Sequence, residues 1–290
     1  MLAIAGTVPS EDFPLVDGKI TMVGNEIRID DKRVSVNRGT PALMAAAIKT
    51  AETLGQPTPF GYLVGDTGLG KGSRHLYKYL TDHLPYSALQ TMTFHYLQPI
   101  VHWHKRLQQV IYEIKERPTL IADAGFMYVA KMSGQAPMYD LFTPDIGELA
   151  FLADEKAPHP FYTRGFILHD ENRVSDLISR AYDHNNASRF LLVKGKQDYL
   201  ASRQGILETV NSPMEEALEA MGGTGDTITG IVSALIDSGM SIPEAAVTAM
   251  KANRLAGHYA KPTPATQVIE IIQHIPRALS EVLRANVAAN

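Results

Sequence analysis

Residues 221–236 read MGGTGDTITGIVSALI, and this stretch is the strongest indication of the fold. Its glycines leave the backbone unobstructed, and an apolar helix follows directly. The N–H groups in the first turn of such a helix lack internal partners, and the helix dipole adds positive potential, so phosphate oxygens are favoured there. The residues predicted to bind phosphate are Gly222, Gly223, Thr224 and Gly225.

Asp226 is an acid in the first turn of this predicted helix. A carboxylate there can accept the proton of a hydroxyl during phosphoryl transfer. It can also be an ordinary capping aspartate, which is the commoner role of a lone acid at a helix start. The glycine density exceeds what a cap needs, and the following helix is apolar enough to be buried. We therefore predict that Asp226 is catalytic.

Predicted strands alternate with predicted helices along most of the chain. Strands are expected at residues 60–64, 88–94, 119–122, 141–143 and 190–193, with a hairpin at 199–210. Helices are expected at residues 42–54, 73–84, 100–115, 176–184, 226–237, 243–259 and 266–283, and another begins near Asp145. This alternation predicts a three-layer α/β/α fold with a mostly parallel central sheet.

Polar residues follow several of the predicted strands. The carboxyl ends of parallel strands meet at one edge of the sheet, where ligands bind in such folds. The candidates at this edge are Asp66, Asp123, Asp145, Glu148 and Lys194. Asp145 and Glu148 lie three apart at a helix start, so they could hold a hydrated magnesium ion or simply complement the helix dipole. Lys194 would contact phosphate unless it is merely solvated.

A second glycine-rich loop, residues 65–73, reads GDTGLGKGS and joins a predicted strand to a predicted helix. It matches a P-loop through Lys71, but Gly72 stands where a P-loop needs serine or threonine for magnesium. We interpret it as a substrate-binding anion loop, with a glycine-rich turn as the alternative. The predicted substrate residues are Gly65, Asp66, Gly68, Gly70, Lys71 and Asp123, with Asn37 and Arg38 before the first long helix.

Residues 19–36 differ from the rest, because apolar and polar residues alternate around turn residues at 24–25 and 30–31. The pattern predicts a small antiparallel β-unit. A lid, a subunit contact within a homo-oligomer and a plain edge hairpin all remain open. We expect one domain overall, in which residues 1–58 form the N-terminal β-appendage and first helix and residues 59–290 form the nucleotide-binding core.

Composition limits the possible partners. The formal net charge is −4, from 27 basic and 31 acidic residues, which gives no electrostatic case for nucleic acid or anionic membrane. There are no cysteines, so thiolate metal sites are excluded. Three histidines, His95, His102 and His104, are near one another in the sequence, but His102 and His104 point to different faces of a predicted helix and are poor co-ligands. No direct protein cage for a metal is therefore predicted. No signal peptide or membrane-spanning run is found, and a cytoplasmic location is the default expectation.

The glycine–aspartate stretch resembles the signature of ribokinase-like enzymes, closest to that of ADP- or ATP-dependent NAD(P)H-hydrate dehydratases. Three shorter segments resemble the same family in the same order: IADAG at 121–125, TPDIGEL at 143–149 and VKG at 193–195. Two departures stand out. The family's Asn-Pro-Gly-Met-Ala-Thr run is replaced by NSPM and EEALEA at 211–220, and its Gly-Gly-Ser-x-Gly-Tyr-Thr-Gly-Ala substrate loop is absent.

The resemblance implies a ribokinase-like fold, ATP or ADP with Mg²⁺ as cofactors, phosphate contacts from Lys194 and Gly195, and an adenine pocket that includes Asn253. It implies phosphoryl transfer to the hydroxyl of a small molecule, with hydrated NAD(P)H as the leading acceptor. A ribokinase-like kinase of a sugar or vitamin alcohol is the first alternative, and a non-catalytic nucleotide-binding module is the second. Retention of Asp226 argues against the module, because a carboxylate near phosphates repels them.

Overall fold

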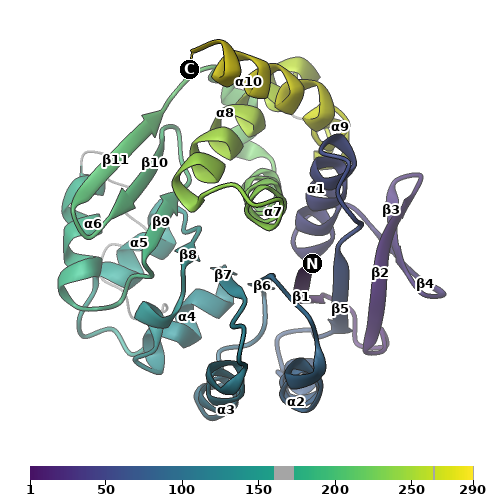
Figure 1. Ribbon diagram of the computed structural model, residues 1–290, viewed down its shortest axis with the longest axis vertical. Coiled ribbons are helices and arrows are strands. Elements are labelled where there is room, and N and C mark those ends of the chain that lie inside the picture. The colour runs from purple at the N-terminus through teal and green to yellow at the C-terminus, as the bar shows by residue number, and fades with distance from the viewer. Residues whose placement is uncertain (160–172, 264, 290) are drawn as a thin grey trace.

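The computed structural model describes residues 1–159, 173–263 and 265–289, and its central feature is one long mixed sheet (Figure 1). The strand order is β11-β10-β9-β8-β7-β6-β1-β5-β2-β3-β4. The strands from β9 to β5 in that order run parallel, and antiparallel strands extend both edges. The strands are β1 (Leu2–Val8), β2 (Val16–Val23), β3 (Glu26–Ile29), β4 (Lys32–Ser35), β5 (Phe60–Gly65), β6 (Thr91–His95), β7 (Thr119–Asp123), β8 (Leu141–Phe142), β9 (Phe190–Val193), β10 (Asp198–Ser202) and β11 (Gly205–Val210).

Helices cover both faces of this sheet, as the three-layer prediction requires (Figure 1). One core joins the sheet to α1 (Thr40–Thr53), α7 (Thr224–Asp237), α8 (Ile242–Ala260), α9 (Val268–Ile272) and α10 (Ile275–Ala289). A second core lies on the opposite face, against α2 (Lys71–His83), α3 (Val101–Glu113), α4 (Gly125–Met132), α5 (Ile146–Ala153) and α6 (Val174–Asp183). The predicted α/β/α class with a mostly parallel sheet is therefore confirmed.

Strand β1 lies in the middle of the sheet, between β5 and β6. All seven of its residues are buried. Leu2 and Ile4 pack into one core, whereas Ala3 and Ala5 pack into the other. Burial on both faces removes the alternation of apolar and polar residues that marks a half-exposed strand. The sequence pattern therefore did not predict β1.

The N-terminal antiparallel unit forms where it is predicted. Strands β2, β3 and β4 make a meander with turns at 24–25 and 30–31. β2 pairs antiparallel with β5, so the meander extends the main sheet at its edge. Ile20, Ile27 and Ile29 are buried in the same core as α1, which anchors the meander to the domain.

The C-terminal region contains a correction. The single helix expected over 266–283 is wrong, because α9 ends at Ile272 and α10 begins at Ile275. Pro276 lies in the first turn of α10, where its missing N–H is tolerated, whereas inside a continuous helix it would remove a hydrogen bond. Within the residues that the structure describes, no helix has the length and apolar character needed to cross a membrane.

Candidate active site

Helix α7 begins at the glycine stretch and points its first turn at a cavity beyond the carboxyl ends of the parallel strands. Gly223 precedes the helix with φ 100°, and a Cβ there would lie 3.1 Å from Val268 Cγ2 and 3.2 Å from Arg38 Cα. Glycine is therefore needed for both conformation and space. The amides of Thr224, Gly225 and Asp226 precede the first bond of the helix, from Thr227 N–H to Gly223 O at 3.1 Å. They are free to face an anion.

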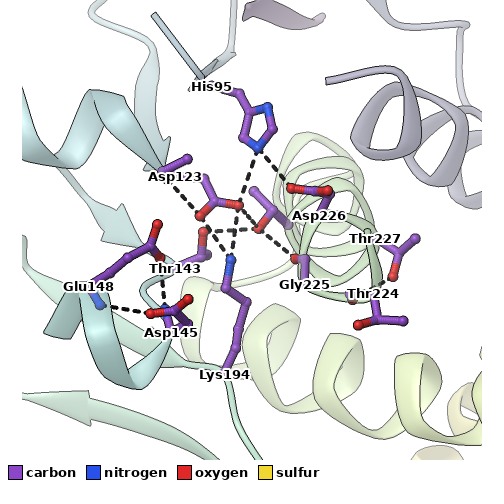
Figure 2. Close-up of polar contacts among 12 residues, drawn as sticks. His95, Asp123, Thr143, Asp145, Glu148, Lys194, Thr224, Gly225, Asp226 and Thr227 are labelled. Atoms are coloured by element: carbon purple, nitrogen blue, oxygen red, sulfur yellow. Dashed lines mark hydrogen bonds and ion pairs between the residues drawn. The ribbon is translucent and has the colours of Figure 1, made fainter. Parts of the chain in front are cut away.

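The carboxylate of Asp226 is held by two donors, of which Figure 2 shows His95. Gly39 N–H donates to Oδ2 at 2.7 Å, and His95 Nε2 lies 3.0 Å from Oδ1. Burial alone would raise the pKa of Asp226, but the hydrogen bond from His95 and the charge of Lys194 outweigh it and lower the pKa below its ordinary value. The side chain is only 13% exposed, so this ionised group is both fixed and largely dry.

A second carboxylate, Asp123 at the end of β7, pairs with Lys194 just after β9. The Lys194 Nζ lies 2.8 Å from Oδ1 and 3.1 Å from Oδ2, and the Thr229 hydroxyl of α7 donates to Oδ2 at 2.7 Å. Burial by itself would lower the pKa of Lys194, but the negative charge of Asp123 and the hydrogen bond to it raise the pKa. Lys194 therefore stays an ammonium at the cavity wall, suited to contact phosphate (Figure 2).

Asp145 and Glu148 form a capping box at the start of α5. Asp145 Oδ1 accepts the Glu148 N–H at 2.7 Å, and Glu148 Oε2 accepts the Asp145 N–H at 2.8 Å. Burial, with the nearby charge of Asp145, raises the pKa of Glu148 to about 8. Oδ2 of Asp145, an exposed residue, is not used by the box and fits water or a hydrated magnesium ion. Capping is therefore observed, and the role in magnesium binding stays a prediction.

A cavity of about 870 Å³ gathers many of the predicted residues. This volume is in the range of pockets that enclose small-molecule ligands. The charged groups line one part of the cavity, and apolar side chains line another: Pro213, Met214, Leu218, Met221 and Ile228. The predicted site residues on its wall are Asp123, Asp145, Glu148, Lys194, Gly195, Gly223, Thr224, Gly225, Asp226 and Asn253.

Two of these residues already have internal partners. The Asn253 side chain accepts from the Thr227 hydroxyl at 2.6 Å and donates to Thr224 O at 3.3 Å, so it braces the first turn of α7. Gly195 N–H donates to Asp198 Oδ1 at 3.1 Å, and Arg254 holds the Gly195 carbonyl at 2.9 Å. Both residues shape the cavity wall, and their contacts with a nucleotide stay predictions.

The loop at residues 65–73 does not line this cavity. Asp66 uses both carboxylate oxygens inside the loop, accepting from the amides of Gly68, Gly70 and Ser73. Lys71 is exposed at the first position of α2. The loop touches the segment after β6, where Gln98 N–H donates to Ser73 Oγ at 3.0 Å. Its predicted role in substrate binding remains a prediction.

Arg38 lies next to the glycine stretch, with its Cδ 3.5 Å from the position that a Cβ on Gly222 would take. Asn37 and Arg38 are exposed, and neither lines the cavity. The following residue, Gly39, contacts Asp226 through its amide. The structure therefore brings this segment to the N-terminal end of α7, where phosphate binding is predicted, and its own contact with substrate stays a prediction.

Sequence reasoning missed His95 and Thr40, which meet at 2.9 Å between Nδ1 and Oγ1 next to Asp226. It also missed Tyr96, a half-exposed side chain on the cavity wall. A usable signal was present. The predicted strand 88–94 is followed directly by His95, just as Asp123 and Lys194 follow theirs, so the strand-end rule also selects this histidine.

His95, Asp123 and Asp226 lie close enough together to hold a cation, because one potential ligand atom from each lies within 4.8 Å of the others. The ammonium of Lys194 already supplies positive charge to this group. All three side chains also have hydrogen-bond partners within the chain. We therefore interpret the cluster as a network of proton and charge partners.

The sheet order, the helices on both faces and the glycine–aspartate helix start over a strand-end cavity define a ribokinase-like protein. The model of the NAD(P)H-hydrate dehydratase family matches residues 100–277, well over half of the chain, and the chain belongs to this family. An uncharacterized protein of Methanocaldococcus jannaschii is 40% identical over 243 residues, which span 83% of this chain and all of that protein.

Solved structures agree on the fold. The ADP/ATP-dependent NAD(P)H-hydrate dehydratase of Bacillus subtilis, co-crystallized with ATP/Mg²⁺, has a TM-score of 0.56 at 14% identity, covering 97% of this chain and 89% of its own. Hydroxyethylthiazole kinase of Pyrococcus horikoshii has a TM-score of 0.56 at 14% identity, covering 98% and 90%. Pyridoxal kinase of Staphylococcus aureus with pyridoxal has a TM-score of 0.54 at 15% identity, covering 87% and 86%. Family and fold together indicate a kinase-like or hydrate dehydratase enzyme.

Proposed function

We propose that this protein transfers a phosphoryl group from ATP or ADP to the hydroxyl of hydrated NAD(P)H and then eliminates phosphate to regenerate the dihydronicotinamide. The observation that carries the proposal is the ionised, doubly held Asp226 in the first turn of α7, beside amides that face the cavity. Family membership supports the choice of acceptor.

In the first step the acceptor hydroxyl oxygen attacks the terminal phosphorus, its proton passes to Asp226, and the shortened nucleotide leaves. A carboxylate with a lowered pKa is a weak base, but the hydroxyl proton becomes acidic as the new P–O bond forms, so a well-aimed acceptor is sufficient. The amides of Thr224 and Gly225 and the ammonium of Lys194 stabilise the charge on the transferring group.

Magnesium is expected to accompany the nucleotide, and the part of the wall beside Lys194, which includes Asp145, fits it. Asp145 offers an oxygen that its capping box does not use, and Glu148 lies beside it. Bound there, the ion would neutralise phosphate charge through its waters. In the second step the phosphate leaves with the C–O bonding electrons, and the neighbouring ring carbon loses a proton to water, which forms the double bond.

A ribokinase-like kinase of a sugar or a vitamin alcohol is the second candidate. The missing family substrate loop favours it, because residues 65–73 and the β2–β4 meander occupy the N-terminal region instead. The two candidates share the first step and differ in product. In a kinase the phosphoester is released intact.

The test is incubation with ATP or ADP and Mg²⁺ against hydrated NADH, with hydroxymethylated heterocycles and sugars in parallel. We expect hydrated NADH to be converted to NADH, seen as recovered dihydronicotinamide absorbance, with one phosphate released per turnover. A stable phosphoester from another acceptor, with no turnover of hydrated NADH, would replace the dehydratase by the kinase. Absence of any nucleotide binding by calorimetry would remove both.

A further inference from the structure

His95 is the last residue of β6, and its side chain is completely buried. The imidazole lies between two partners. Its Nδ1 is 2.9 Å from the Thr40 hydroxyl. Its Nε2 is 3.0 Å from Asp226 Oδ1, a contact drawn in Figure 2. Thr40, the first residue of α1, is also completely buried. Both ring nitrogens are therefore used, and neither is offered to the cavity.

The partners decide which nitrogen carries the proton. The lowered pKa of Asp226 makes its carboxylate ionised, and an ionised carboxylate only accepts hydrogen bonds. Nε2 must therefore be the N–H donor. In the neutral ring Nδ1 is then an acceptor, and it receives the Thr40 hydroxyl proton. With a neutral ring, the hydrogen-bond chain therefore runs in one direction, from the Thr40 hydroxyl through His95 to Asp226.

The packing around Thr40 makes room for this contact. Gly6, on the neighbouring strand β1, pairs with His95 across the sheet. A Cβ on Gly6 would lie 2.5 Å from Thr40 Oγ1 and 2.6 Å from the His95 carbonyl oxygen. Since any larger residue at position 6 would displace Thr40, the glycine in the middle of a buried strand accommodates the hydroxyl–imidazole pair.

The nearest competing acceptor is already satisfied. Asp123 Oδ2 is 3.8 Å from His95 Nε2, beyond hydrogen-bond distance. Asp123 instead accepts from Lys194, from the Thr229 hydroxyl and from the Ala124 amide. The bond from His95 is therefore directed at Asp226 alone.

We propose that His95 is a positioning residue. Its ring is oriented by the Thr40 hydroxyl, and it holds the Asp226 carboxylate in the orientation that accepts the substrate proton. This inference rests on the proposed function. Gly39 N–H fixes Oδ2 and His95 fixes Oδ1, so the plane of the carboxylate is set from two sides. Each oxygen keeps a second lone pair, and proton acceptance needs only one.

Two substitutions distinguish the hydrogen bond at Nε2 of His95 from the one at Nδ1. The amide nitrogen of His95→Gln can take the place of Nε2, whereas the amide oxygen of His95→Asn takes the place of Nδ1. We expect His95→Asn to lower kcat by about 10–100-fold, the usual effect of removing an orienting partner, with little change in nucleotide KM. His95→Gln should recover most of that loss. Thr40→Val should lower kcat less than His95→Asn does. Thr40→Ser keeps the hydroxyl and should therefore restore kcat to near the wild-type value.

His104→Gln is the matched control, because His104 is equally buried but contacts Gln135, Ser133 and Tyr139 instead of a carboxylate. Its kcat should equal that of the wild type at a temperature where all variants are folded. Melting temperatures establish that range. If His95→Asn does not fold, the Thr40 pair and His95→Gln carry the test.

A pH titration gives a readout that a purely structural role would not move. The charged and titratable groups around Asp226 are His95 from β6, Asp123 from β7, Lys194 after β9 and Tyr96 after β6. Losing the donor on Oδ1 should raise the pKa of Asp226. The acid limb of the kcat profile should then move to higher pH in His95→Asn and stay near the wild-type position in His95→Gln.

The same shift should appear without turnover, in the carbon-13 titration of the Asp226 carboxyl in each variant. Identical titrations and identical kcat in wild type, His95→Asn and His95→Gln would overturn the inference. A wild type that turns over no acceptor would refute the proposed function instead, and the carboxyl titration would still decide whether His95 holds Asp226.

Discussion

Among the described residues, His95 and His104 are two completely buried histidines, and they differ in what they contact. His95 ends a central strand, lies beside the cavity and bonds the carboxylate of Asp226. His104 lies in α3 and bonds only neutral groups: Gln135 Oε1 at 3.1 Å, Ser133 Oγ at 3.0 Å and the Tyr139 hydroxyl at 2.7 Å. Burial lowers the pKa of His104 to about 3. Burial alone therefore says little about function, and the charge of the partner says more.

The largest effect is expected at the carboxylate that distinguishes the His95 network. Asp226→Asn should reduce turnover by roughly 10²–10⁴, the usual worth of a positioned proton acceptor. Its melting temperature should change little, because the amide oxygen can accept from Gly39 while the imidazole adopts its other tautomer. Nucleotide affinity should hold or improve, since a negative charge near the phosphates is gone. Steady-state kinetics and calorimetry measure both quantities, and near wild-type turnover would remove Asp226 from the mechanism.

The next effect tests the charge balance of the same network. Lys194→Met leaves the carboxylate of Asp123, 1% exposed, without its cation. We expect a loss of about 3 kcal/mol in the free energy of unfolding, measured by urea denaturation. The double variant Asp123→Asn/Lys194→Met should recover much of that stability but not the nucleotide affinity. A single variant as stable as the wild type would show that the pair is not coupled.

The His104 network should respond to pH through stability and not through activity. In the unfolded chain histidine titrates near pH 6.5, whereas in the folded protein the pKa of His104 is about 3. Between these values the unfolded state binds the extra proton, so this contribution to stability falls as pH falls, by at most about 1.4 kcal/mol per pH unit. Denaturation of wild type and His104→Gln in steps from about pH 7 to about pH 4 should show a steeper loss in the wild type. Parallel curves would contradict this assignment.

The smallest effect is expected at Lys71, which belongs to neither network. Its side chain is exposed, and an exposed charge contact contributes at most about 1 kcal/mol. Lys71→Ala should raise the acceptor KM by no more than about fivefold and leave nucleotide affinity unchanged. Lost nucleotide binding would instead mean that residues 65–73 act as a phosphate loop.

The parts of the site that follow from local pattern could be predicted. Asp123 and Lys194 end apolar strands, and parallel pairing brings such ends to one edge, where they meet at 2.8 Å. The glycines before Asp226 could also be recognised locally, because they leave the backbone unobstructed directly before an apolar helical segment. Strand β1 could not be predicted in the same way, because its burial on both faces and its internal Gly6 remove the usual strand pattern.

The contacts that join distant segments were beyond the reach of local pattern. Nothing near His95 in the chain indicates that Thr40 and Asp226 will be its partners. Likewise, the spacing of Asp145 and Glu148 fits both a capping box and a magnesium site. The folded structure shows that one carboxylate oxygen of each residue is taken by the cap. The prediction of a single helix over residues 266–283 was wrong because the apolar pattern continues across the break between α9 and α10, just before Pro276.

The two bonds that hold Asp226 join residues made far apart in time. Gly39 is 187 positions and His95 is 131 positions before Asp226. At ribosomal rates of roughly 5–20 residues per second, Asp226 is added about 10–40 s after Gly39. Until then the nascent chain holds the imidazole and the Gly39 amide with no carboxylate between them. In the mechanism proposed above, a fragment that stops before α7 would therefore lack the proton acceptor and would not consume nucleotide.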